Sequence, residues 1–186
     1  MVYLQSRNVI HRDLSARNLL VSNVDGKYEA KVADFGLSRE TDEYKAESSL
    51  IPIRWSAPEV LQRKAATSKS DVFSFAIVIH EILTFASIPY ENIQTNREVM
   101  DFVIKGKRMP KVTSCSEKLY DLMMDCWKED PADRPNFMEV LERLQDIAIE
   151  DRPVLATNDS IYGFTNDQYQ DGSKAEYSQT KYEYDQ

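Results

Sequence analysis

The sequence predicts a mainly α-helical domain that carries one short β-hairpin. Residues 70–84, SDVFSFAIVIHEILT, are apolar nearly all round, which is the pattern of a helix buried on every side. Capping-box sequences at 95–98 and 136–139 indicate the starts of two further helices. The dipeptide Asp25-Gly26 is typical of a tight hairpin turn. These observations together predict the fold class.

Composition limits the class of protein. With 186 residues, 42% of them hydrophobic and 29% charged, the chain is long enough for one domain with a packed core. A formal net charge of −8 argues against nucleic acid as a partner and against a general anionic-membrane surface. The two cysteines, Cys115 and Cys126, have no metal or redox spacing, so we expect reduced thiols in the cytosol.

Residues 9–21, VIHRDLSARNLLV, concentrate polar groups that are suited to chemistry. Asp13 stands between Arg12 and Arg17, and neighbouring cations favour an ionised carboxylate that accepts a proton or holds a metal. The alternative interpretation is a polar loop with ordinary salt bridges.

The predicted hairpin pairs residues 19–22 with residues 30–33. This pairing would return the chain so that Asp34 lies beside Asn18. Carboxylate and amide oxygens are ligands that hard cations prefer, so the two residues predict a Mg²⁺ and phosphate site.

Helix start and stop signals place three helices after residue 84. The Thr95 box opens a helix that ends at Gly106, Ser116 opens the next, and the Asn136 box opens the last. The apolar face of the second helix comprises Leu119, Leu122, Met123, Cys126 and Trp127. The residues of the last helix expected to face the core are Phe137, Val140, Leu141 and Leu144.

Three motifs follow one another in a set order. His-Arg-Asp-Leu at 11–14 has an Asn five residues after its Asp, Asp-Phe-Gly stands at 34–36, and Ala-Pro-Glu stands at 57–59. This set resembles the signature of protein kinases. The resemblance runs from about residue 1 to about residue 149, and it implies the large lobe of a protein-kinase domain.

The finer pattern is similar to the tyrosine kinase branch. Ser15 stands where serine/threonine kinases usually place Lys, and Arg17 stands four residues after the catalytic Asp, as in tyrosine kinases. The sequence Ile-Pro-Ile-Arg-Trp at 51–55 agrees, as does Cys-Trp at 126–127 ahead of residues 130–135.

The resemblance also implies an amino-terminal lobe that is missing from these residues. Met1 to Leu4 resembles the end of the helix that leads into the catalytic loop, so we expect Met1 to be internal. No Gly-rich phosphate loop of the GxGxxG type occurs. We therefore expect residues 1–150 to be a partial kinase domain, a fragment that is inactive alone.

The resemblance assigns a reaction, with ATP and Mg²⁺ as cofactors and a protein tyrosine hydroxyl as the acceptor. Asp13 is implied to orient the hydroxyl and accept its proton, and Arg17 to support the transferred group or that Asp. Asn18 and Asp34 are implied to bind Mg²⁺. The residues implied to contact ATP are Leu20 and Ala33, under the adenine, together with Asn18 and Asp34.

Other positions receive supporting roles from the same resemblance. The implied platform for the substrate ring comprises Pro52, Ile53, Arg54 and Trp55. The implied structural supports are His11, Phe35, Glu59, Asp71 and Arg134. Asp71 would accept backbone donors near His11 and Arg12, and Arg134 would form a buried pair with Glu59.

Residues 37–50 show no helical or strand period, so we expect a mobile loop. Tyr44 stands in its middle, where tyrosine kinases carry an activating phosphotyrosine. Arg12, beside Asp13, and a loop cation such as Arg39 are suited to bind that phosphate through charge-assisted hydrogen bonds. The alternative for Tyr44 is an ordinary surface tyrosine.

The composition changes towards the carboxyl terminus. Residues 154–186 contain six acids, two lysines and few aliphatic side chains, so residues 151–186 are predicted to form a disordered acidic tail. Five of the ten tyrosines lie there: Tyr162, Tyr169, Tyr177, Tyr182 and Tyr184. Such a tail resembles those that recruit phosphotyrosine-binding proteins of the SH2 type, and the alternative is an unmodified solubilising tail.

The function that these observations predict is protein tyrosine phosphorylation in signal transduction. The rival from another class is a pseudokinase scaffold that presents phosphotyrosine docking sites, and the rival within the class is a serine/threonine kinase. The expected location is the cytoplasmic side of the cell, with membrane attachment through the missing upstream region as an open alternative.

Overall fold

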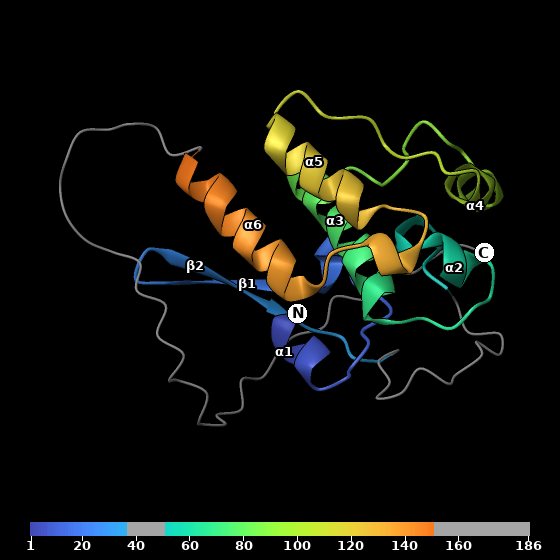
Figure 1. The fold of residues 1–186 in the computed structure, drawn as a ribbon. Helices are drawn as coiled ribbons and strands as arrows, with labels where there is room; N and C mark the ends of the chain where they lie inside the picture. Colours follow the sequence, from blue (N-terminus) through green and yellow to red (C-terminus); the bar gives the residue numbers. More distant parts are fainter. Residues whose placement is uncertain (37–50, 151–186) are drawn as a thin grey trace. The chain divides into compact units, whose positions relative to one another are not determined.

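The computed structural model describes residues 1–36 and 51–150 (Figure 1). Its helices and strands are α1 (Val2–Ser6), β1 (Leu19–Val24), β2 (Lys27–Val32), α2 (Pro58–Leu61), α3 (Ser68–Leu83), α4 (Asn96–Ile104), α5 (Glu117–Cys126) and α6 (Phe137–Glu150). Short 3-10 helices span Ala16–Asn18, Ile53–Trp55 and Pro131–Asp133. The predicted fold class, mainly α with a two-stranded hairpin, is confirmed. Among the described residues, no helix combines the length and the apolar run that crossing a membrane requires.

Helix α3 lies at the centre of the core. Its amino end is capped by Thr67, and ten of its residues are buried, including Val72, Phe73 and Ile77 at 0% exposure. Helix α5 packs along α3, α6 packs on α5, and α1 contacts α6 (Figure 1). The prediction of burial on every side fails in the last turn, where Ile82 is 62% exposed because the helix end reaches the surface.

The hairpin forms as predicted around Asp25 and Gly26. Both residues have positive φ, 51° and 80°, which is the geometry of a two-residue turn that matches the twist of the strands. The strands pair from Leu19 opposite Val32 to Val24 opposite Lys27, so each strand extends further towards the turn than predicted. The turn chemistry thus fixes the register of this part of the site.

The later helices begin at the predicted residues. Thr95 and Ser116 accept hydrogen bonds from the amides of the first turns of α4 and α5, and Asn136 caps α6 in the same way. Helix α4 ends just before Gly106, whose φ of 76° is the left-handed conformation that ends helices. Leu141 was expected in the core but is 39% exposed, because the buried side of α6 follows Phe137, Val140, Leu144 and Ile147.

Glu59 of α2 and Arg134 form a buried ion pair. Both guanidinium NH groups of Arg134 donate to the two carboxylate oxygens of Glu59 at 2.8 Å, and the side chains are 0% and 8% exposed. The remaining donors of Arg134 bind the carbonyls of Lys128, Lys69 and Glu129. Burial pushes the pKa of Glu59 up, but the hydrogen bonds and charge of Arg134 outweigh it and hold the pKa below its ordinary value.

We expect Arg134→Leu to lower the free energy of unfolding by about 3–5 kcal/mol at neutral pH, because it leaves the Glu59 carboxylate buried without a partner. The folded-state pKa of Glu59 lies below its unfolded value, so the stabilisation is present above the ordinary carboxyl range and is lost as pH falls through the folded pKa. The difference between variant and wild type should therefore shrink in acid.

Denaturant unfolding of both proteins from pH 7 downwards measures this difference. The matched control is Glu117→Gln, which breaks the exposed pair with Lys111 and should change stability far less. A loss at Arg134→Leu no larger than that of the control would contradict the importance of the buried pair.

Candidate active site

A carboxylate of α3 binds the backbone of the segment from Ile10 to Leu14. Asp71, 1% exposed, accepts the amide of His11 on Oδ2 at 2.7 Å and the amide of Arg12 on Oδ1 at 3.0 Å. Burial raises the pKa of Asp71, and these two amide hydrogen bonds oppose the rise. Arg12 has a φ of 70°, a conformation that costs about 1–3 kcal/mol for a non-glycine residue, so Asp71 stabilises a strained backbone.

Asp13 is held on both of its carboxylate oxygens. Arg17 Nη2 donates to Oδ1 at 2.5 Å, and Asn18 Nδ2 donates to Oδ2 at 3.1 Å and to the Asp13 carbonyl at 2.7 Å. The 3-10 helix Ala16–Asn18 folds both donors back towards Asp13. The side-chain nitrogen of Asn18 faces Asp13, which leaves the side-chain oxygen Oδ1 as the atom suited to bind a metal. Oxygen is the ligand atom that Mg²⁺ prefers.

The hairpin returns the chain to this loop. The amide of Ala33, one residue before Asp34, donates to the Asn18 carbonyl at 2.8 Å. His11 joins the two segments: its Nδ1 accepts the Asp13 amide at 3.3 Å, so the proton is assigned to Nε2, which donates to the Ala33 carbonyl at 3.0 Å. The ring of Phe35 lies 5.2 Å from that of His11, centroid to centroid.

The remaining residues predicted to contact Mg²⁺ or ATP are Asp34 and two residues of the hairpin region, Leu20 and Ala33. Asp34 is exposed, has a φ of 60°, and accepts the Gly36 amide on Oδ1 at 3.2 Å. Leu20 is 44% exposed and Ala33 is half-buried. Within residues 1–36 and 51–150, no group of three or more His, Cys, Asp or Glu side chains could hold a metal by itself. Asn18 and Asp34 offer oxygen donors, so a Mg²⁺ ion held by them would take its other ligands from phosphate and water.

The predicted platform forms a 3-10 helix, Ile53–Trp55, whose middle residue faces the protein. Arg54 donates to the carbonyls of Pro89, Tyr90, Ile93 and Gln94 and to Asn96 Oδ1, at 2.7 to 3.4 Å. Its side chain is thus used to anchor the platform to the loop before α4. Pro52 and Ile53 are half-buried, and Trp55 lies under Arg17, whose guanidinium carbon is 4.7 Å from the ring centroid.

Glu81 of α3 was missed by the sequence reasoning. It is 6% exposed, and its Oε2 accepts both the Ala16 amide and the Trp55 indole N–H at 2.9 Å. The available signal was a second carboxylate, besides Asp71, inside an apolar helix, because a buried carboxylate requires hydrogen-bond donors.

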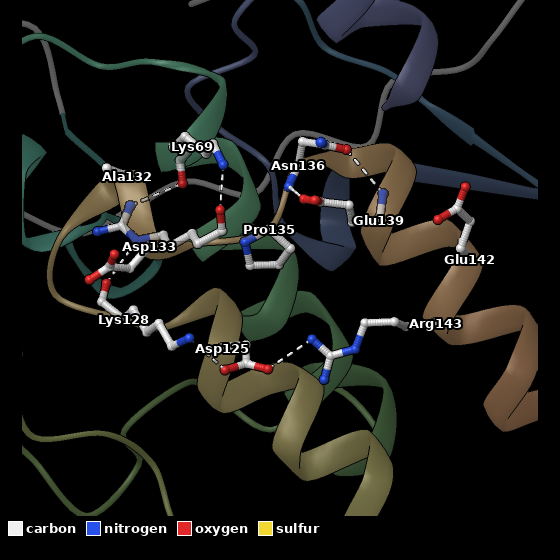
Figure 2. A pocket seen from close by; sticks show the side chains of 11 residues that line it. Lys69, Asp125, Lys128, Ala132, Asp133, Pro135, Asn136, Glu139, Glu142 and Arg143 are labelled. Atoms are coloured by element: carbon white, nitrogen blue, oxygen red, sulfur yellow. Dashed lines mark hydrogen bonds and ion pairs between the residues drawn. The ribbon is translucent and has the colours of Figure 1, made fainter.

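A hollow of about 560 Å³ lies away from these residues, between the start of α3, the end of α5 and α6 (Figure 2). Across it, the Asp125 carboxylate binds Lys128 at 3.0 Å and Arg143 at 2.8 Å. Since the charges neutralise one another, this hollow presents no single ligand chemistry. Cysteine chemistry is not indicated either, because burial raises the pKa values of Cys115 and Cys126, the latter to about 12.

The predicted regulatory tyrosine and the predicted docking tyrosines of the tail remain predictions. Tyr44 and the five tail tyrosines lie outside the described residues.

Comparison with known proteins agrees with this geometry. Residues 1–144 match the family model described as protein tyrosine and serine/threonine kinase. The chain belongs to this family.

Several relatives share long stretches of sequence with the chain. The human tyrosine-protein kinase Srms is 42% identical over 79% of this chain and 30% of the relative. Tyrosine-protein kinase SRK2 of Spongilla lacustris is 46% identical over 81% of this chain and 41% of the relative. The fibroblast growth factor receptor homolog 1 of Drosophila melanogaster is 46% identical over 76% of this chain and 20% of the relative. The chain thus spans less than half the length of each.

Proposed function

We propose that this chain serves a protein tyrosine kinase, as the large lobe that carries the catalytic loop. The proposal rests on the hydrogen bonds that Arg17 and Asn18 donate to the two carboxylate oxygens of Asp13. A carboxylate fixed in this way is suited to orient a hydroxyl and accept its proton. Two relatives are named as tyrosine-protein kinases, which supports tyrosine as the acceptor.

The proposed reaction moves the γ-phosphoryl group of ATP to a tyrosine hydroxyl. The hydroxyl oxygen forms a bond to phosphorus, the bond to the β-phosphate oxygen breaks, ADP leaves, and the proton passes to Asp13. Asn18 Oδ1 and the Asp34 carboxylate would hold Mg²⁺, which neutralises charge on the phosphates. Trp55 and the platform would support the ring of the acceptor.

The hairpin offers apolar surface to the nucleotide. Leu20 and Val24 lie on the same face of β1, because side chains alternate along a strand, and they are 44% and 52% exposed. We propose that the adenine and an amino-terminal lobe cover this surface in the full-length protein. The 186-residue chain alone is then expected to be inactive, since positioning supplies roughly 7–11 kcal/mol of barrier lowering.

Further proposals concern regulation and location. The acidic, tyrosine-rich residues 151–186 would recruit SH2-type proteins once phosphorylated. An ATP-using site with two free cysteines suits the cytoplasmic side of the cell.

Asp13→Asn in the full-length protein is expected to lower the rate of transfer about 10²–10⁴-fold while nucleotide affinity stays nearly unchanged. The same chemical change at Asp25, in the hairpin turn, is the control, because Asn-Gly also suits that turn. Single-turnover transfer to a peptide that contains tyrosine, serine and threonine, followed by phosphoamino-acid analysis of the product, measures the effect. An Asp13→Asn variant as active as wild type would refute the role of Asp13 as the proton acceptor. A phosphoserine product would indicate the serine/threonine branch. An inactive full-length wild type would favour the pseudokinase scaffold.

We also expect Tyr44→Phe to lower the activity of the full-length protein after incubation with ATP. A phosphate on Tyr44 adds about −1.5 to −2 charges, which Arg12 can bind beside Asp13. Arg12→Ala should then make activity independent of Tyr44 phosphorylation. Tyr28→Phe is the control, since this tyrosine is 78% exposed on the hairpin. Equal activation of Tyr44→Phe and Tyr28→Phe would leave Tyr44 an ordinary surface tyrosine.

A further inference from the structure

Helix α3 carries a row of polar residues on one side. Ser70, Ser74 and Glu81 follow one another at intervals of four and seven residues, which places them on one face of a helix. Ser70 Oγ donates to Glu59 at 2.8 Å, and Ser74 Oγ donates to the Trp55 carbonyl at 2.7 Å. This face therefore contacts the platform and the segment after it.

Glu81 is the member of this row that reaches two functional segments at once. One of its two carboxylate oxygens, Oε2, accepts hydrogen bonds from both the Ala16 amide of the catalytic loop and the Trp55 indole N–H of the platform, each at 2.9 Å. Hydrogen bonds to a charged acceptor are stronger than those between neutral groups. Because both donors share one oxygen, a displacement of either segment strains the bond to the other.

The contact continues from Glu81 to the catalytic carboxylate. Arg17 follows Ala16, and its guanidinium lies over the Trp55 ring at 4.7 Å while it donates to Asp13. Stacking on an aromatic face fixes the plane of a guanidinium as well as its position. The orientation of Trp55 thus determines where Arg17 holds Asp13.

We propose that Glu81 is a positioning residue that sets the placement of the substrate platform relative to Asp13. This inference rests on the proposed kinase function and adds to it a residue that touches neither substrate nor nucleotide. Removing the carboxylate would misalign Asp13 and the acceptor hydroxyl, so the rate of transfer would fall. The affinity for ATP would not, because the residues proposed to hold it are Asn18, Asp34, Leu20 and Ala33.

Glu81→Met in the full-length protein is expected to lower kcat roughly ten- to a hundredfold, with the KM for ATP nearly unchanged. Glu81→Gln keeps an oxygen that accepts both N–H groups and should retain most of the rate. The control is Thr67→Ala, which removes the cap of α3 and lowers stability without contacting either segment. Melting temperatures of all variants separate loss of fold from loss of position.

Trp55→Phe gives a second, milder variant that removes the indole N–H but keeps an aromatic ring for Arg17. If Glu81 acts through Trp55, this change should cost less in the Glu81→Met background than in wild type. Additive effects of the two changes would overturn the proposal, as would a kcat of Glu81→Met no lower than that of Thr67→Ala.

The hydrogen bond itself has a readout that does not depend on activity. The chain has two tryptophans, and the Nε1 of Trp127 has no hydrogen-bond partner in the described part of the chain. In a ¹H–¹⁵N spectrum, Glu81→Gln should shift the Trp55 indole resonance and leave that of Trp127 in place. An unmoved Trp55 resonance would overturn the proposal, whereas an inactive wild type with the shift would overturn the kinase function on which it rests.

Discussion

The rest of the site depends on the two hydrogen bonds that the Asp71 carboxylate accepts from the backbone amides of His11 and Arg12. The carboxylate belongs to the most buried helix of the described chain, and its two oxygens fix consecutive amides at 2.7 and 3.0 Å. Arg12 is held in a left-handed conformation next to Asp13. Without that turn, Asp13 would not be presented to Arg17 and Asn18, so the cost of burying Asp71 is offset by an ordered loop.

Helix α3 acts as the reference frame for the other segments. Its apolar residues join α5 and α6 in the core, and four of its polar residues bind the catalytic loop, the platform or Glu59. Asp71 holds the catalytic loop, Ser70 contacts Glu59, Ser74 contacts Trp55, and Glu81 joins Trp55 to Ala16. A rigid, close-packed helix is well suited to this task because core packing leaves it little freedom to move.

Sequence reasoning predicted the elements whose signals are local. The Asp25-Gly26 turn and the caps at Thr95, Ser116 and Asn136 follow from neighbouring residues, and the structure has them. The family motifs led to the expected contact of Glu59 with Arg134. The inward role of Glu81, the exposure of Leu141 and the anchoring role of Arg54 depend on tertiary packing between distant segments. Periodicity in one helix does not contain that information.

Amide hydrogen exchange in an Asp71→Asn variant tests most directly whether α3 positions the catalytic loop. Asparagine keeps one acceptor oxygen and replaces the other by an NH₂ group, so one of the two amides loses its bond. We expect faster exchange at whichever of the His11 and Arg12 amides loses its bond, with the amides in the middle of α3 still protected. Unchanged exchange at His11 and Arg12 in a folded variant would contradict it, because the loop would then hold its conformation without the carboxylate.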